Sequence, residues 1–170
     1  KKTVYPVYWA YGPESLKARE LAARVLKTLQ DESKNQSFVW IREVLDGSEI
    51  DGAELADLSQ SMSLLGEKKL YWVRDAHLIK DTESLKRLMG GAKKIEELDA
   101  VLFFMAKDLD LRKKFSKELI DLCPVIECGE IPERDRVSWI EYLAKRENLS
   151  ELSGAMTERL AGLDPWSLDI

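Results

Sequence analysis

Runs of apolar residues alternate along the chain with amphipathic stretches, which indicates strands that alternate with helices. The runs rich in β-branched and aromatic residues predict strands at 4–11, 38–45, 69–74, 100–106 and 125–128. Apolar residues at helical spacing predict helices at 14–29, 51–61, 83–88 and 111–122. The run from Ala100 to Ala106 is apolar throughout, which is typical of a strand covered on both faces. We therefore predict an α/β fold, a parallel sheet of about five strands with helices on both faces.

The pattern changes near residue 130. Two helical stretches follow, at 135–147 and 151–161, and no strand is predicted among them. We place a domain boundary near 129–133, so that residues 1–130 form the α/β domain. Residues 131–170 then form the start of a small all-α domain, which we expect to be truncated at the end of the sequence.

Composition narrows the classes of protein that fit. The net charge is −5 and the isoelectric point about 5.1, which argues against a chain that binds nucleic acid by itself. The longest apolar run is far too short to span a membrane and no secretory leader opens the chain, so we expect a cytoplasmic protein. The two cysteines, Cys123 and Cys128, flank a predicted strand and are expected to be reduced and partly buried.

A parallel α/β fold raises the question of a nucleotide site after the first strand. A phosphate-binding loop needs glycines for close backbone approach, a lysine on the terminal phosphates and a serine or threonine on magnesium. The turn at 11–17 has one glycine and no Gly-Lys-Ser/Thr, and Glu14 stands where phosphate would bind. Lys17 is expected to face solvent. We therefore predict no ATP hydrolysis, no nucleotide cofactor and no metal site.

Two polar residues follow the predicted strand at 69–74 and leave a second kind of chemistry open. Asp75 is placed like a magnesium-site carboxylate, but no second carboxylate follows it to polarise a water. His77, the one histidine of the chain, could act as a general base. A small-molecule enzyme would require both side chains to converge in a deep pocket, whereas a histidine at the surface near a strand end is the more common case.

A leucine pair between the predicted helix at 51–61 and the next strand is the remaining candidate. Met62, Ser63, Leu64 and Leu65 stand just before Gly66 and a basic turn. The leucines could close the core beneath the helix, or they could form a compact apolar knob that enters a pocket of a partner. The residues alone leave both interpretations open.

Several short stretches, taken in order and spacing, extend over nearly the whole chain: 7–14, 44–47, 62–70, 73–78, 107–114, 131–135 and 139–140. Together they resemble the delta subunit of the bacterial DNA polymerase III clamp loader. The resemblance implies an AAA+-like fold with a degenerate nucleotide site, followed by a helical lid domain. It also implies a subunit without catalytic activity of its own, although the polymerase III holoenzyme as a whole is a DNA-directed DNA polymerase.

The same resemblance implies partners and site residues. Subunits of this family bind the sliding clamp, a beta-type ring, and help to open it for loading on primed DNA. They work with other clamp-loader subunits in a hetero-oligomer and meet DNA only indirectly. The family's clamp-binding motif maps onto Met62, Ser63, Leu64 and Leu65, and Leu65 stands where an aromatic residue is often found. The family's collar domain has no counterpart in this sequence. The alternatives are an AAA+ or P-loop-type ATPase and a small-molecule α/β enzyme.

Overall fold

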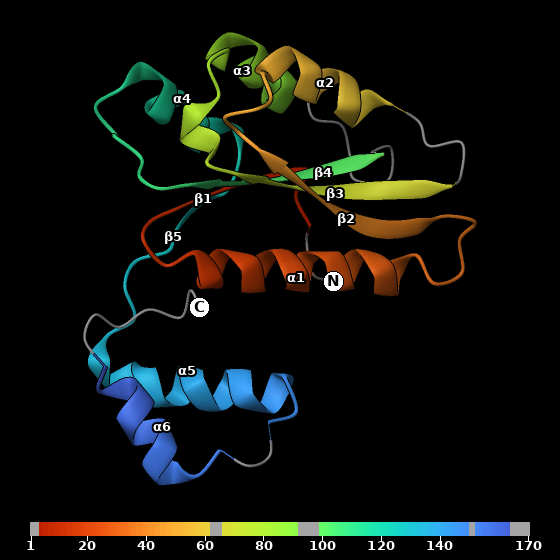
Figure 1. Ribbon diagram of the computed structural model, residues 1–170. Helices are drawn as coiled ribbons and strands as arrows, with labels where there is room; N and C mark the ends of the chain where they lie inside the picture. The colour runs from red at the N-terminus through yellow and green to blue at the C-terminus, as the bar shows by residue number, and fades with distance from the viewer. Residues whose placement is uncertain (1–3, 62–65, 92–98, 150–151, 164–170) are drawn as a thin grey trace. The chain divides into compact units, whose positions relative to one another are not determined.

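A computed structural model describes residues 4–61, 66–91, 99–149 and 152–163 of the chain (Figure 1). The chain divides into two compact units, Lys1–Cys128 and Gly129–Ile170. Each unit is described by itself below.

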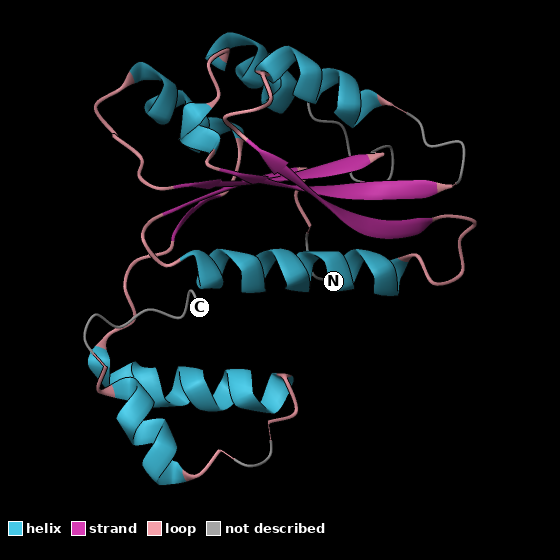
Figure 2. Ribbon diagram, in the orientation of Figure 1, coloured by secondary structure: helices cyan, strands magenta, loops and turns pink. Residues whose placement is uncertain are grey.

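The first unit is built on a five-stranded sheet in which every pair of neighbours is parallel. Figure 2 shows the strands in magenta, and their order across the sheet, with the labels of Figure 1, is β2-β3-β4-β1-β5. The strands are β1 (Val7–Tyr11), β2 (Val39–Asp46), β3 (Glu67–Arg74), β4 (Ala100–Ala106) and β5 (Val125–Glu127). Parallel neighbours need crossover connections, and the helices between the strands supply them. The predicted fold class is confirmed.

Helices cover both faces of this sheet, as Figure 1 shows. One face carries α1 (Ser15–Glu32), and the other carries α2 (Gly52–Gln60), α3 (Thr82–Gly90) and α4 (Lys114–Leu122). A single turn of 3-10 helix, η1 (Ala76–Leu78), follows β3. The sheet is therefore buried from both sides, which explains why β4 is apolar along its whole length.

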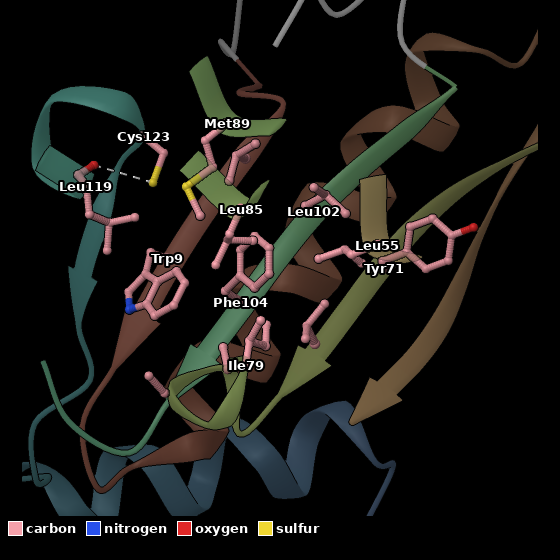
Figure 3. Packing of buried hydrophobic residues seen from close by; sticks show 14 of the residues in the cluster. Trp9, Leu55, Tyr71, Ile79, Leu85, Met89, Leu102, Phe104, Leu119 and Cys123 are labelled. Carbon is pink, nitrogen blue, oxygen red and sulfur yellow. Dashed lines mark hydrogen bonds between the residues drawn. The ribbon is translucent and has the colours of Figure 1, made fainter. Parts of the chain in front are cut away.

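The central strands hold the two halves of the core together. On the face under α2 to α4, Trp9 of β1 stacks on Phe104 of β4 with ring centroids 5.2 Å apart (Figure 3). On the face under α1, Tyr8 and Trp72 both stack on Phe103, each at 5.3 Å. Offset aromatic pairs of this kind add to the free energy gained from burial. β4 contributes to both clusters and is the middle strand of the sheet.

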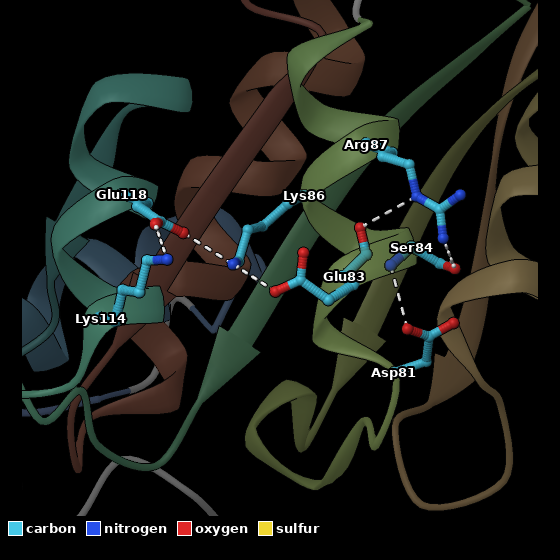
Figure 4. Close-up of polar contacts among 7 residues, drawn as sticks. All are labelled: Asp81, Glu83, Ser84, Lys86, Arg87, Lys114 and Glu118. Atoms are coloured by element: carbon cyan, nitrogen blue, oxygen red, sulfur yellow. Dashed lines mark hydrogen bonds and ion pairs between the residues drawn. The ribbon is translucent and has the colours of Figure 1, made fainter.

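An ion-pair network joins α3 to α4 above the sheet (Figure 4). The Lys86 ammonium lies 2.7 Å from a carboxylate oxygen of Glu118 and 2.6 Å from one of Glu83. The hydrogen bond from Lys86 lowers the pKa of Glu118, and the same bond raises the pKa of Lys86. Because the pKa of Glu118 is lower in the folded chain than in the unfolded one, the ion pair contributes fully to stability at a pH above the ordinary carboxyl pKa. This contribution is lost as the pH falls through the lowered pKa.

Several boundaries differ from the predictions by one to three residues. The first strand begins at Val7 rather than at residue 4. The helix predicted from residue 111 begins at Lys114, because residues 110–113 form a turn. In that turn Asp110 accepts hydrogen bonds from the backbone and the side chain of Arg112, and the backbone N–H of Lys113 donates to the Asp110 carbonyl. A side chain that binds the local backbone competes with the helix.

The second unit contains α5 (Glu133–Arg146) and α6 (Gly154–Ala161). Ser153 accepts a hydrogen bond from the backbone N–H of Met156 and caps α6, so this helix starts later than the predicted residue 151. The Arg136 guanidinium donates to the carbonyl of Ala161 at 3.1 Å and ties the two helices together. Among the described residues of the chain, no helix has the length and apolar character needed to cross a bilayer.

Candidate functional site

The carboxyl ends of the five strands meet at one edge of the sheet, where open α/β folds usually bind ligands. The turn between β1 and α1 is the position at which a phosphate loop would lie. It has three residues, Gly12, Pro13 and Glu14. Gly12 has φ +129°, and a Cβ there would stand 2.4 Å from the carbonyl oxygen of Cys128. The turn therefore presses directly against the chain that follows β5.

The backbone N–H groups of this turn are already used. Gly12 donates to the carbonyl of Ala106 at 3.2 Å, and Glu14 donates to that of Cys128 at 3.0 Å. Pro13 has no N–H to offer. A phosphate loop holds its anion with such N–H groups pointing at the ligand, and here they bind the ends of the neighbouring strands instead.

The charges at this turn also disfavour an anion. Glu14 is buried at the N-terminus of α1, where the helix dipole attracts negative charge. Its carboxylate therefore occupies the place where a phosphate would interact most favourably with the dipole. Lys17, one turn further along, is half-buried rather than facing solvent as predicted. It lies close enough to Cys128 to lower the pKa of that thiol, although burial raises this pKa by more.

The two cysteines offer no nucleophile. Cys123 and Cys128 are free and buried, as predicted. Burial raises the pKa of the Cys123 thiol to about 12, and its sulfur donates to the carbonyl of Leu119 (Figure 3). Because the thiolate is the reactive form, both groups are inert at neutral pH.

Asp75 and His77 do not form a pocket. Asp75 sits in the left-handed backbone region, with φ +48°, and its side chain is exposed. His77 is exposed as well, and its Nδ1 accepts a weak hydrogen bond from the backbone N–H of Lys107 at 3.4 Å. Neither residue lines the hollow beside α2 or the one beside α5 and α6 among the described residues. Within that part of the chain, no three His, Cys, Asp or Glu side chains are grouped as metal ligands would be.

A direct test of this edge is a thermal-shift measurement with ATP and magnesium. We expect no change in the unfolding midpoint of the chain at millimolar nucleotide, because the turn offers phosphate no free N–H group and a negative charge instead. A ligand that binds the folded state at concentrations far above its Kd would stabilise it by RT ln(1 + [L]/Kd). A concentration-dependent rise in the midpoint would contradict this interpretation of the turn.

The leucine pair lies in the sequence between α2 and β3. Met62, Ser63, Leu64 and Leu65 lie outside the described residues. The structure describes the residues on either side of them, at the end of α2 and at Gly66.

The flank before the pair is the end of α2. Asp51 and Glu54 form a reciprocal capping box at the start of this helix, and Leu55 anchors it in the core. At its end the carbonyl of Leu58 accepts hydrogen bonds from the backbone N–H of Ser61 at 3.3 Å, from the Ser61 hydroxyl at 2.8 Å and from the Tyr71 hydroxyl at 3.3 Å. These hydrogen bonds hold the end of α2 in place at Ser61.

The flank after the pair is Gly66. It has φ +69°, a conformation that favours glycine, and its carbonyl accepts from the backbone N–H of Val39 at 3.0 Å. A Cβ on Gly66 would stand 3.1 Å from the carbonyl oxygen of Ser37. Gly66 is thus held in place at the start of β3.

The structure adds a feature that the sequence pattern did not suggest. A hollow of about 630 Å³ lies between the end of β2 and α2, and we call it the β2–α2 hollow. Its lining includes the apolar Val44, Ile50 and Leu58 and the acidic Asp46, Glu49, Glu54 and Asp57. β2 is an edge strand of the sheet, so Val44 is 49% exposed although it lies in a strand. Strand order across the sheet decides this exposure, and the local sequence does not determine strand order.

Comparisons with known proteins place the fold. No protein-family profile and no curated protein sequence matches the chain. Among solved structures, the Bacillus subtilis DNA clamp loader delta protein (YqeN) matches with a TM-score of 0.61 and 23% identity, over 85% of this chain and 44% of that one. A variant of Thermotoga maritima RuvB matches with a TM-score of 0.61 and 17% identity, over 94% of this chain and 49% of that one.

A third solved structure, the Aeropyrum pernix ORC2 protein, matches with a TM-score of 0.54 and 11% identity, over 84% of this chain and 46% of that one. The chain thus spans less than half the length of each of these three proteins. At these identities the likeness concerns the fold. The expected resemblance is confirmed at that level: the chain has an AAA+-like fold and is similar in structure to a bacterial clamp loader delta protein.

Proposed function

We propose that the chain is the amino-terminal part of a non-catalytic clamp-loader subunit that binds a DNA polymerase sliding clamp through Met62–Leu65. In this proposal it acts beside other clamp-loader subunits in the cytoplasm and meets DNA through them. The clamp is a ring, and the subunit helps to open one of its interfaces.

The observation that carries the proposal is the likeness to the clamp loader delta protein over 85% of the chain. It agrees with the order of short stretches that resemble the delta subunit in the sequence. That protein is more than twice the length matched here, so assembly with further subunits is a proposal for the whole protein rather than for this chain alone.

The closed turn at Gly12–Glu14 favours this function over that of an ATPase. Proteins of the same fold can bind nucleotide, since the Aeropyrum pernix ORC2 structure is of ADPNP-ADP complexes. In the present chain the N–H groups of Gly12 and Glu14 are bound by Ala106 and Cys128. A subunit that has lost its phosphate loop can still serve as a binding element of a larger machine.

The proposed contact is small and apolar. Burying two leucine side chains in a partner's pocket contributes on the order of 1.5–3 kcal/mol each, which is the size of an interface hot spot. α2 is capped and anchored in the core, so it presents the segment from a rigid base. Preorganisation of this kind reduces the entropy lost on binding.

Ring opening would follow from a difference in affinity. A protein shifts a conformational equilibrium only by as much as it binds one state better than the other. The chain must therefore bind the open clamp interface more tightly than the closed one. Clamp binding and clamp opening then use the same surface.

Sedimentation of the chain with a purified bacterial sliding clamp tests the proposal. We expect a complex that forms equally well with and without ATP and magnesium, because binding rests on apolar contacts and the chain lacks a phosphate loop. Bovine serum albumin, which is also an acidic protein, serves as a control for non-specific association. Absence of a complex at concentrations up to about 100 μM would overturn the assignment. A Kd of about 100 μM corresponds to a favourable binding free energy of roughly 5–6 kcal/mol.

A further inference from the structure

We infer that the β2–α2 hollow is a second docking surface, for a short segment of another protein that carries apolar side chains between lysines or arginines. This goes beyond the proposed clamp contact and does not depend on it. The hollow and the segment 62–65 use different residues, so each surface can be tested alone.

The floor of the hollow is apolar. Leu45, Ile50 and Leu58 are half-buried in its lining and pack against the core cluster on the side of the sheet that α2 covers. Together they form one concave apolar surface in a hollow of about 630 Å³. A volume of this size accommodates a few side chains of a peptide.

The walls of the hollow are rigid. On one side, β2 is paired with β3 along its whole length, from Val39 to Asp46. On the other side, α2 is fixed by its capping box and by the hydrogen bonds that end at the Leu58 carbonyl. The surface is therefore preformed, and a ligand would not have to order it.

The charge of the rim selects the ligand. Asp46, Glu49, Glu54 and Asp57 all line the hollow, and among the described residues no cation does. One neighbouring cation, Arg74, lies 3.4 Å from Asp46 and offsets one of the four negative charges. Glu54 accepts a hydrogen bond from the backbone N–H of Asp51. The remaining negative charge attracts a cationic segment and repels nucleic acid and acidic peptides.

The position at the sheet edge suggests how such a segment would lie. β2 ends the sheet on this side, and an edge strand is a template for an added extended chain. Apolar side chains of the segment would enter the hollow, and its lysines or arginines would lie near the carboxylates of the same lining.

The test is an NMR titration of the ¹⁵N-labelled 170-residue chain with the synthetic peptide Ac-KLKVKL-amide. We expect saturable shift changes at the amides of Val44, Ile50 and Leu58. The charge-inverted peptide Ac-ELEVEL-amide has the same apolar residues and should produce none. Raising the ionic strength to about 1 M, where the Debye length is about 3 Å, should weaken binding of the basic peptide.

Two variants separate the hollow from overall charge. Glu49→Lys with Asp57→Lys reverses the charge of two exposed residues of the lining and should weaken binding of the basic peptide by about tenfold or more. The matched control, Asp108→Lys with Asp121→Lys, makes the same change of net charge at exposed positions away from the hollow and should leave binding unchanged. Both double variants change surface residues, and their unfolding midpoints show whether the fold is kept.

Three results would overturn the inference. The first is a lack of shift changes at the hollow with the basic peptide, and the second is equal weakening by the rim and control variants. The third is concentration-dependent change at Val44 and Leu58 without peptide, together with a dimer in sedimentation, which would assign the surface to a second copy of the chain. Clamp binding is measured separately, so failure of either proposal leaves the other standing.

Discussion

Replacing Leu64 and Leu65 together with alanine is expected to abolish clamp binding while the chain stays folded. The variant removes two apolar anchors, each worth on the order of 1.5–3 kcal/mol when buried in a partner. The affinity for a purified clamp should fall by about 100-fold or more, since each 1.4 kcal/mol is a factor of about ten. Titration calorimetry of both proteins against the same clamp measures this difference.

We expect the fold to survive because the variant keeps the described core side chains on both flanks of the segment. Leu55 and Tyr71 are buried there, and both are retained in the variant. Leu78→Ala with Leu111→Ala is the matched control, because these leucines are 47% and 51% exposed and follow the carboxyl ends of β3 and β4. If the Leu64/Leu65 variant bound the clamp as tightly as the unmodified chain, the assignment of the site would be wrong.

Replacing Gly12 with alanine is expected to destabilise the first unit by about 3 kcal/mol or more. The residue has φ +129°, and the new Cβ would stand 2.4 Å from the carbonyl oxygen of Cys128. That oxygen belongs to the backbone and accepts from Glu14, so it can move only if the turn opens. Urea unfolding followed by tryptophan fluorescence gives the change in the free energy of unfolding.

Gly90→Ala is the control for this variant. Gly90 is the last residue of α3, its backbone has no positive φ, and its added Cβ would meet a side-chain atom of Leu122 at an ordinary 3.7 Å. Alanine is preferred over glycine in a helix by up to about 1 kcal/mol. We expect Gly90→Ala to be neutral or slightly stabilising. Equal free energies of unfolding for the two variants would show that the β1–α1 turn is not as closely packed as described.

The parts of the fold that a local pattern can specify were predicted well. The run from Ala100 to Ala106 became β4 with the predicted bounds, because a strand buried on both faces must be apolar at every position. The helix predicted at 83–88 is present as α3, which is longer by one residue at its start and by two at its end.

The parts that depend on distant neighbours could not be predicted from the pattern. The N–H groups of the β1–α1 turn bind Ala106 and Cys128, which belong to segments far along the chain. Lys17 looked like a solvent-facing residue on an amphipathic helix, yet it is half-buried near Cys128. The absence of a phosphate-loop lysine was visible in the sequence, whereas the use of the turn's own donors became visible in the structure.

The candidate site divides in the same way. The choice of Met62, Ser63, Leu64 and Leu65 came from resemblance, and because these residues lie outside the described part of the chain it stays a prediction. The β2–α2 hollow could not be predicted without the strand order, which puts β2 at an edge of the sheet and leaves Val44 exposed.

The most direct test of the central claim is a methyl NMR titration of the chain with an unlabelled purified sliding clamp. Methyl signals of Met62, Leu64 and Leu65 are predicted to change and to saturate at a fixed ratio of chain to clamp. Those of Leu78 and Leu111, which follow the carboxyl ends of β3 and β4, should stay unchanged. Saturating changes at Leu78 and Leu111 with none at Leu64 and Leu65 would contradict the account.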